Sequence, residues 1–295
     1  MKEIHFTKMH GIGNDYIYID CFKEKVEDPA YLAKIMSPRR TSVGSDGVIL
    51  ICPSDTADAK MRMFNLDGSE GKMCGNGIRC VGKYIYDNGI ARKKKLTVET
   101  LSGIKTLYVT EENGKAVSLT VDMGEPILTP HLIPVKFNGN KMINEPVNIS
   151  GTEYRITAVS MGNPHAVVFC DDIKGLNLEK TGPLFEFNPI FPEQVNTEFI
   201  RVKDSKNLEM RVWERGSGET FACGTGACAA AAAAVLNGYC KRTEEIAVHL
   251  KCGVLTIKYA EDGHIYMRGA EVIEPLRVEE MRSSRAHISV DRVGW

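Results

Sequence analysis

The feature that most constrains the fold is an internal repeat. The segment MRMFNLDGSEGKMCGNGIRC at residues 61–80 aligns without a gap with MRVWERGSGETFACGTGACA at residues 210–229, at an offset of 149 residues. A Met-Arg pair, an aromatic residue, a glutamate, a cysteine and two glycines coincide. At the same offset, GNDYIYID at residues 13–20 aligns with GNPHAVVF at residues 162–169. Because two separate windows agree at one offset, the sequence predicts two similar halves.

Each half carries the same pattern of short strands and one long helix. Apolar alternation after each Cys-Gly-x-Gly motif predicts helices over residues 77–88 and 226–237, each stopped by a glycine. The second helix contains six consecutive alanines, an all-small surface that suits burial inside a sheet. The fold class is therefore α/β (α+β), with two pseudo-symmetric domains. Predicted strands are 4–7, 16–20, 48–52, 96–100, 107–110 and 117–122 in the first half, and 155–159, 166–170, 198–202, 209–213, 246–250 and 254–259 in the second.

The repeat also suggests where the domains divide. We expect an N-terminal domain at residues 1–122, completed by a strand near 270–275, and a C-terminal domain at residues 123–269. The stretch 124–140 is rich in Pro, Gly and Asn and is interpreted as a linker. Residues 276–295 have no evident place in either repeat.

Composition narrows the class of protein. The 295 residues are 43% hydrophobic and 25% charged, which is typical of a globular chain large enough for two domains. A net charge of −1 gives no electrostatic reason to expect nucleic acid or an anionic membrane as partner. No signal-peptide pattern and no apolar run of membrane-spanning length is present, so we expect a cytoplasmic protein with a small-molecule substrate. Nine cysteines without a Cys-x-x-Cys pair predict no zinc site.

Two of the cysteines lie where a helix is expected to begin. Cys74 and Cys223 each precede Gly-x-Gly and then the apolar helical spacing. Unpaired N–H groups and the helix dipole favour an anion there, so a thiol at Cys74 is expected to have a lowered pKa. The same N–H groups could bind a substrate carboxylate. If the halves are related by a pseudo-twofold axis, two weak bases could address opposite faces of one carbon, which suits racemisation or epimerisation.

The motifs MHGIGNDYIYID, FNLDGSEGKMCGNGIRC, VSMGNPHAV and WERGSGETFACGTGACA occur in this order and reach from the N-terminus to about residue 270. In these motifs the chain resembles the diaminopimelate epimerase family. The resemblance implies two α/β domains, each a barrel-like sheet around a central helix, with the active site in the cleft between them. It implies epimerisation of LL-diaminopimelate to the meso isomer, in lysine and peptidoglycan-precursor biosynthesis, without a cofactor or metal, by a homodimer.

The resemblance also implies roles for individual residues. Cys74 would be the proton donor and Cys223 the proton acceptor, with His165 and Glu214 assisting the thiols. Two positions depart from expectation: Gly47 can offer only backbone contact, and Leu66 is bulkier than the small residue expected there. The implied substrate-binding residues are Asn14, Gly47, Asn65, Gly75, Asn76, Asn163, Asn196, Glu214, Arg215, Gly224 and Thr225.

Four other functions fit parts of the sequence less well. GTGACA at residues 224–229 fits a dinucleotide-binding motif, but a polar loop precedes it instead of a strand. A thiol redox protein predicts neighbouring cysteines, and a binding module leaves the paired thiols without a purpose. The closest alternative is a racemase of proline, hydroxyproline or another amino acid on the same architecture. Arg215 and the asparagines favour a substrate with two polar ends.

Overall fold

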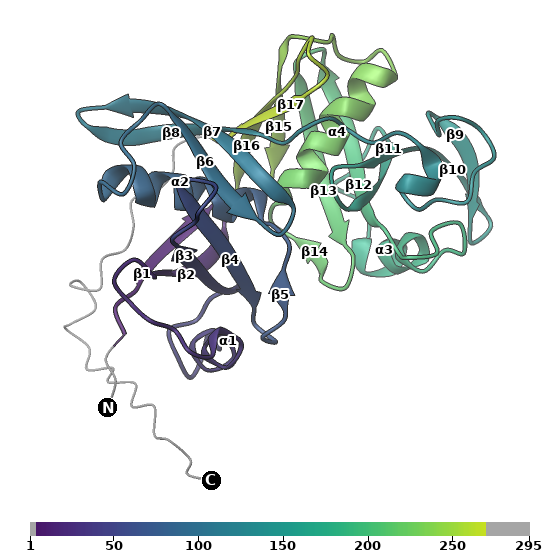
Figure 1. Cartoon of the computed structure of the whole chain (residues 1–295). Coiled ribbons are helices and arrows are strands. Elements are labelled where there is room, and N and C mark those ends of the chain that lie inside the picture. The colour runs from purple at the N-terminus through teal and green to yellow at the C-terminus, as the bar shows by residue number, and fades with distance from the viewer. Residues whose placement is uncertain (1–3, 270–295) are drawn as a thin grey trace. The chain divides into compact units, whose positions relative to one another are not determined.

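The computed structural model describes residues 4–269, which fall into two compact units, residues 4–117 and residues 118–269 (Figure 1). The division lies inside strand β8 (Lys115–Asp122), slightly before the boundary predicted after Asp122. The strand predicted near 270–275 and the tail at 276–295 lie outside the described residues.

The first unit is built on a mostly antiparallel sheet. Its strands pair in the order β1-β2-β3-β4-β6-β7, and the short β5 pairs with β4. Only the β2–β3 and β4–β6 pairs are parallel. The strands are β1 (Thr7–Gly11), β2 (Asn14–Asp20), β3 (Gly47–Cys52), β4 (Ala59–Asn65), β5 (Glu70–Gly71), β6 (Lys95–Thr100) and β7 (Gly103–Glu112).

The second unit repeats this order and extends it. Strands β10-β11-β12-β13-β15-β16 pair as β1 to β7 do, again with two parallel pairs, and β9, β17 and β8 lengthen the sheet at its ends. The short β14 pairs with β13, as β5 does with β4. The strands are β9 (Glu145–Ile149), β10 (Thr152–Ser160), β11 (Pro164–Phe169), β12 (Asn196–Asp204), β13 (Asn207–Glu214), β14 (Gly218–Thr220), β15 (Glu245–Leu250), β16 (Gly253–Tyr259) and β17 (Ile265–Gly269).

One long helix occupies the centre of each unit. Helix α2 (Gly75–Asp87) packs against β1, β2, β4, β6 and β7, and helix α4 (Gly224–Leu236) packs against seven strands of the second unit (Figure 1). The alanines of α4 from Ala229 to Ala234 are all fully buried. Since alanine combines the highest helix propensity with the smallest apolar side chain, the sheet can approach α4 from every side. The predicted central helices are confirmed, and each begins two residues earlier than expected.

The first strand was predicted wrongly. The apolar residues at 4–7 suggested a strand there, but β1 begins only at Thr7 and continues to Gly11. A tight hairpin turn sets this register, because Gly11 pairs with Asn14 across Ile12 and Gly13. Both turn residues have positive φ, 53° and 80°, as a two-residue type I′ hairpin requires. A β-branched residue such as Ile12 rarely adopts this conformation, so the residue types did not predict the turn.

Two helices and one packed segment were also missed. Helix α1 (Pro29–Met36) is capped by Asp28, whose carboxylate accepts from the Tyr31 amide at 2.9 Å, and helix α3 (Leu178–Glu186) contains an internal proline. The stretch 124–140 is not a linker. Its residues Ile133 and Val135 are buried in the core of the second unit, and the 3₁₀ turn η1 (Pro130–Leu132) precedes them.

Candidate active site

The two cysteines singled out by the repeat are the N-cap residues of the two central helices. Cys74 has φ −127° and ψ 117°, and Cys223 has φ −126° and ψ 112°. Each sulfur accepts a hydrogen bond at 3.3 Å from the amide of the third residue after it, Gly77 or Gly226. The sulfur therefore fills the place that a serine or aspartate oxygen usually takes at a helix start. The position expected from the sequence is confirmed.

Three other predicted residues of the first unit lie at the ends of strands. Asn14 begins β2, Gly47 begins β3 and Asn65 ends β4. The register places Gly47 opposite both Tyr16 and Asn65, so these three strand ends meet at one edge of the sheet. We call Asn14, Gly47, Asn65, Cys74, Gly75 and Asn76 the N-terminal half-site.

A short chain of hydrogen bonds orients the Cys74 thiol. Its sulfur donates to Asn14 Oδ1 at 3.1 Å, and Asn14 Nδ2 donates to Asp46 Oδ2 at 2.7 Å. Tyr16 is buried beside them, and burial, Cys74 and Asp46 all raise the pKa of its phenol. The thiol of Cys74 therefore faces an amide and a neutral phenol.

The amide side chain of Asn76 is already used inside the unit. Its Oδ1 accepts from Arg79 Nη2 at 2.9 Å, and Arg79 Nη1 also donates to the Gly75 carbonyl at 3.0 Å. Both Asn76 and Arg79 are buried. Asn76 can thus offer a ligand its backbone N–H, which lies in the first helical turn and has no partner within the helix.

Both departures noted in the sequence have a local explanation. A Cβ atom at Gly47 would lie 2.1 Å from the Phe64 carbonyl oxygen and 3.0 Å from a ring carbon of Tyr16. Only glycine fits that close approach between strands. Leu66 is 51% exposed and so does not fill space inside the unit.

The second unit builds a matching cluster from equivalent strand ends. Asn163 directly precedes β11, Asn196 begins β12, Glu214 ends β13 and Arg215 follows it. Asn196 bridges the strands, because its Nδ2 donates to the Pro164 carbonyl at 2.8 Å and its Oδ1 accepts from the Arg215 amide at 2.9 Å. We call Asn163, His165, Asn196, Glu214, Arg215, Cys223, Gly224 and Thr225 the C-terminal half-site.

The Cys223 thiol lies among acidic groups. It is only 5% exposed, and burial, Glu214 and Glu198 raise its pKa, while Thr225 and the Gly226 amide act in the opposite direction. Burial also raises the pKa of Glu214, whose Oε1 accepts from the Thr220 hydroxyl at 2.5 Å. Desolvation of the sulfur therefore outweighs the helix N-terminus here. The lowered pKa expected for a capping thiol does not extend to Cys223.

A second carboxyl group in this cluster was not predicted from the sequence. Glu198 is fully buried, and its Oε1 lies 2.7 Å from Nδ1 of the fully buried His165. The other ring nitrogen of His165, Nε2, lies 3.0 Å from Asn163 Oδ1. The available signal was a glutamate between Thr197 and Phe199 in a strand whose neighbours are apolar, since a buried strand rarely carries an unpaired carboxylate.

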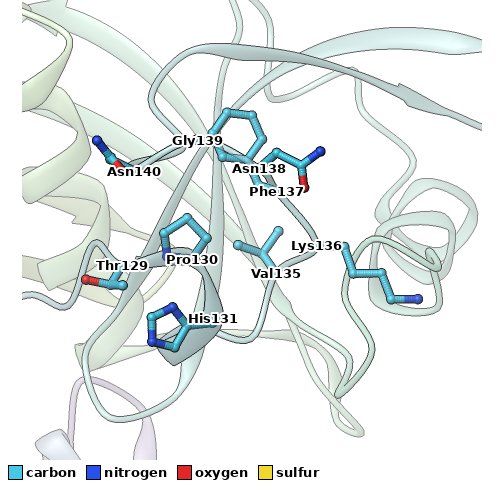
Figure 2. Close-up of a pocket in the computed structure, with 9 residues that line it drawn as sticks. All are labelled: Thr129, Pro130, His131, Val135, Lys136, Phe137, Asn138, Gly139 and Asn140. Carbon is cyan, nitrogen blue, oxygen red and sulfur yellow. The ribbon is translucent and has the colours of Figure 1, made fainter.

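Other features of the surface and the side-chain chemistry lie apart from the half-sites. A hollow of about 1220 Å³ is lined by residues from the segment between β8 and β9, and Figure 2 shows them. No predicted site residue lines it. Within residues 4–269, no group of three or more His, Cys, Asp or Glu side chains could hold a metal ion. None of the helices described is long and apolar enough to cross a membrane.

The predicted site residues thus form two clusters, one in each unit, around equivalent capping sulfurs. Comparison with known proteins identifies the family to which the chain belongs. The family model described as diaminopimelate epimerase matches residues 6–129 and residues 157–274, one stretch in each half of the chain.

Curated relatives carry the same description. The chain is 54% identical over 270 residues to diaminopimelate epimerase of Acetivibrio thermocellus, covering 91% of this chain and 96% of the relative. It is 53% identical over 265 residues to diaminopimelate epimerase of Methanococcus maripaludis, covering 90% and 95%.

Solved structures of lower sequence identity share the fold. A probable proline racemase from Agrobacterium radiobacter has a TM-score of 0.69 at 13% identity, with 98% of this chain and 94% of that chain covered. A hydroxyproline epimerase from Agrobacterium vitis has a TM-score of 0.65 at 15% identity, with 93% and 91% covered. At such identities the likeness establishes the mixed, sheet-dominated α+β fold alone.

Proposed function

Because the chain belongs to the diaminopimelate epimerase family, we propose that it converts LL-diaminopimelate to the meso isomer by moving protons at one α-carbon with two thiols. The observation that carries this mechanism is the equivalence of Cys74 and Cys223 as N-caps of the two central helices. A thiol can both accept and donate a proton, so a pair of thiols can invert a carbon without a polyprotic base.

Each half-site has a defined part in the proposed reaction. Cys223 removes the α-proton from one face, and Cys74 delivers its own proton to the other face; the roles exchange in the reverse direction. The α-carboxylate accepts from backbone N–H groups of Gly75, Asn76, Gly224 and Thr225. Hydrogen bonds of this kind stabilise the negative charge that develops as the proton leaves, which is usually the largest catalytic contribution.

Cys223 needs a base to become a thiolate, because its raised pKa keeps it protonated near neutral pH. Glu214 is suited to that task. Its charge acts on the Cys223 thiol, and burial raises its own pKa, so its ionised form is a better proton acceptor than an exposed carboxylate. A substrate ammonium group entering this acidic cluster would also stabilise the thiolate by opposite charge.

The remaining polar residues fit the far end of the substrate, which is a second amino-acid head group. Arg215 is exposed, and one of its nitrogens, Nη1, donates to the Glu193 carbonyl at 2.8 Å. This contact orients the guanidinium while leaving other N–H groups to bind the distal carboxylate. The side-chain amides of Asn14, Asn65, Asn163 and Asn196 are candidates for contacts with the substrate's ammonium groups and its distal carboxylate.

Other aspects of the proposal concern the whole protein. We expect a homodimer that works in the cytoplasm, needs no cofactor and serves lysine and peptidoglycan-precursor biosynthesis. The domain limits proposed from the repeat are residues 1–122 with a strand near 270–275, and residues 123–269. Light scattering on the purified chain tests the dimer, since a monomeric mass at assay concentration would contradict it.

An assay of substrate choice tests the function directly. Purified protein, without added cofactor and after exhaustive chelation, should convert LL-diaminopimelate to the meso isomer. Chiral chromatography measures the conversion. Proline and trans-4-hydroxyproline serve as parallel substrates and should show no change. If the protein inverts proline and does not convert diaminopimelate, the chain is a proline racemase and the proposed function is wrong.

A further inference from the structure

Glu198 is a buried carboxylate directly beside the start of helix α4. A Cβ atom built on Gly226 would lie 2.5 Å from Glu198 Oε1 and 3.2 Å from Cys223 Sγ, so both groups crowd the same point in the first helical turn. Oε1 also lies 2.7 Å from His165 Nδ1. Oε2 is buried and has no hydrogen-bond partner among residues 4–269. Burying such a group is unfavourable unless a partner compensates for it.

The hydrogen bonds around His165 fix where its protons are. Asn163 Oδ1 can only accept, so the ring nitrogen 3.0 Å away, Nε2, carries a hydrogen. The remaining contact, between Nδ1 and Glu198 Oε1, holds one further hydrogen that lies on either atom. In both arrangements the two side chains are together neutral and Nε2 remains a donor. Asn163 Oδ1 at Nε2 and the Glu198 carboxyl at Nδ1 therefore together hold the imidazole with Nε2 as a donor.

The equivalent positions in the first unit have different residues. At the offset of 149 residues, Ile49 corresponds to Glu198 and Tyr16 to His165. A Cβ atom on Gly77, the counterpart of Gly226, would lie 2.6 Å from the Ile49 side chain, so the isoleucine occupies the same place against its helix. An apolar side chain can therefore pack at this position between the strand and the helix. The acid in the second unit is thus not needed to pack the strand against the helix.

We propose that Glu198 is a positioning residue, which holds His165 with its hydrogen on Nε2 and thereby fixes the side chain of Asn163. With Oδ1 held by the imidazole, the Asn163 amide presents its N–H₂ group as the free end. This inference rests on the proposed function, in which Asn163 contacts the substrate.

Nuclear magnetic resonance of protein labelled with ¹⁵N-histidine tests the proton arrangement without reference to activity. Protonated and bare imidazole nitrogens give separate ¹⁵N signals, and a His165→Phe spectrum identifies the pair to be followed. Wild-type protein should show a protonated Nε2. Glu198→Gln should keep it, because the glutamine amide can donate to Nδ1. Glu198→Leu should give a mixture of tautomers; an unchanged single form in that variant would overturn the proposal.

Kinetics with diaminopimelate test the consequence for binding. Losing the orientation of Asn163 removes a contact made in ground state and transition state alike, so KM should rise about tenfold in Glu198→Leu while kcat changes less than about threefold. Glu198→Gln should restore KM to within about threefold of wild type. Failure of glutamine to restore KM, with the tautomer retained, would contradict the positioning role.

Glu186 offers a matched control for a structural effect. It is a buried carboxylate of the same unit that accepts from Trp213 Nε1 at 2.7 Å and from the Gly216 amide at 2.8 Å. Glu186→Leu should lower the melting temperature yet leave the His165 signals unchanged. If wild-type protein proves inactive on diaminopimelate, the proposed function fails. The ¹⁵N spectra still decide whether Glu198 determines which ring nitrogen of His165 carries the hydrogen.

Discussion

The two half-sites share a backbone and differ in chemistry. In both, three strand ends meet at a helix capped by a cysteine, with nearly the same cap dihedrals. In the first, the thiol donates to an amide oxygen and lies beside a phenol; in the second, it lies among two carboxyls and an imidazole. Among the residues exchanged at the common offset are Tyr16 for His165, Ile49 for Glu198, Asn65 for Glu214 and Leu66 for Arg215.

This difference shows which properties a repeat transmits. The helix start, the sulfur and the register depend on local geometry, so the two copies share them. The charge around each sulfur depends on side chains that point into the site, and these have diverged. In the proposed mechanism, one thiol must hold a proton when the other lacks it, and different surroundings suit such a pair. The following predictions test how far the two copies are equivalent.

The largest effect should follow from removing either sulfur. Cys74→Ala and Cys223→Ala should each lower the rate of epimerisation by about 10²–10⁴-fold or more, as for loss of a general acid or base. Run from a single isomer in D₂O to low conversion, the wild-type enzyme should place deuterium in the product and almost none in recovered substrate. Equal early labelling of both would indicate a single polyprotic base.

The exchange of residues between positions 66 and 215 should affect kcat/KM strongly at position 215 and weakly at position 66. Arg215→Leu gives the second half-site the residue of the first and should lower kcat/KM roughly thirtyfold or more, the effect of losing a charged partner of the substrate. Leu66→Arg should change kcat/KM by about twofold at most, because Leu66 is exposed. Circular dichroism should show both variants folded. A comparable loss in both would refute the assignment of the distal carboxylate to Arg215.

The buried alanine face of helix α4 should tolerate a small polar side chain but not a larger apolar one. Ala232→Leu introduces bulk on a fully buried face of α4 and should lower the free energy of unfolding by about 1–3 kcal/mol, measured with urea. Ala232→Ser is the matched control, since its hydroxyl can bond to the carbonyl one turn earlier. At the equivalent position α2 carries Lys83, which donates to the Ala116 carbonyl at 2.7 Å. Unchanged stability of the leucine variant would show that the sheet around α4 is loosely packed.

Alkylation should reveal the difference between the thiols directly. At pH 7, iodoacetamide should modify the half-buried Cys74 about tenfold faster than Cys223, which is buried and has a raised pKa. A raised pKa means a smaller thiolate fraction at any given pH. Labelling of Cys223 should therefore keep increasing with pH above about 8.5, where an ordinary thiol is half ionised. Peptide mass spectrometry distinguishes the sites, and equal rates at pH 7 would contradict the different surroundings.

The sequence revealed more of the backbone than of the electrostatics. The offset, the capping positions and both central helices follow from local patterns, which nearby residues determine. Glu198 was missed because its role depends on the parallel pairing of β11 with β12, which brings it near His165 from 33 residues away. The raised pKa of Cys223 could not be read from the helix start, because burial, a property of the whole unit, outweighs the local helix terminus. Ile12 escaped notice because its left-handed turn conformation is uncommon for its residue type.

The sulfur atoms at the helix starts have a practical consequence for preparing an inert protein. Each sulfur both caps a helix and carries out the proposed proton transfer, so alanine at either position removes the cap together with the chemistry. Serine separates the two, because its hydroxyl is among the preferred N-cap groups and is too weakly acidic to replace the thiol. A protein with serine at both positions should remain folded and bind diaminopimelate without turning it over. Such a protein would be the form in which to crystallise the substrate complex.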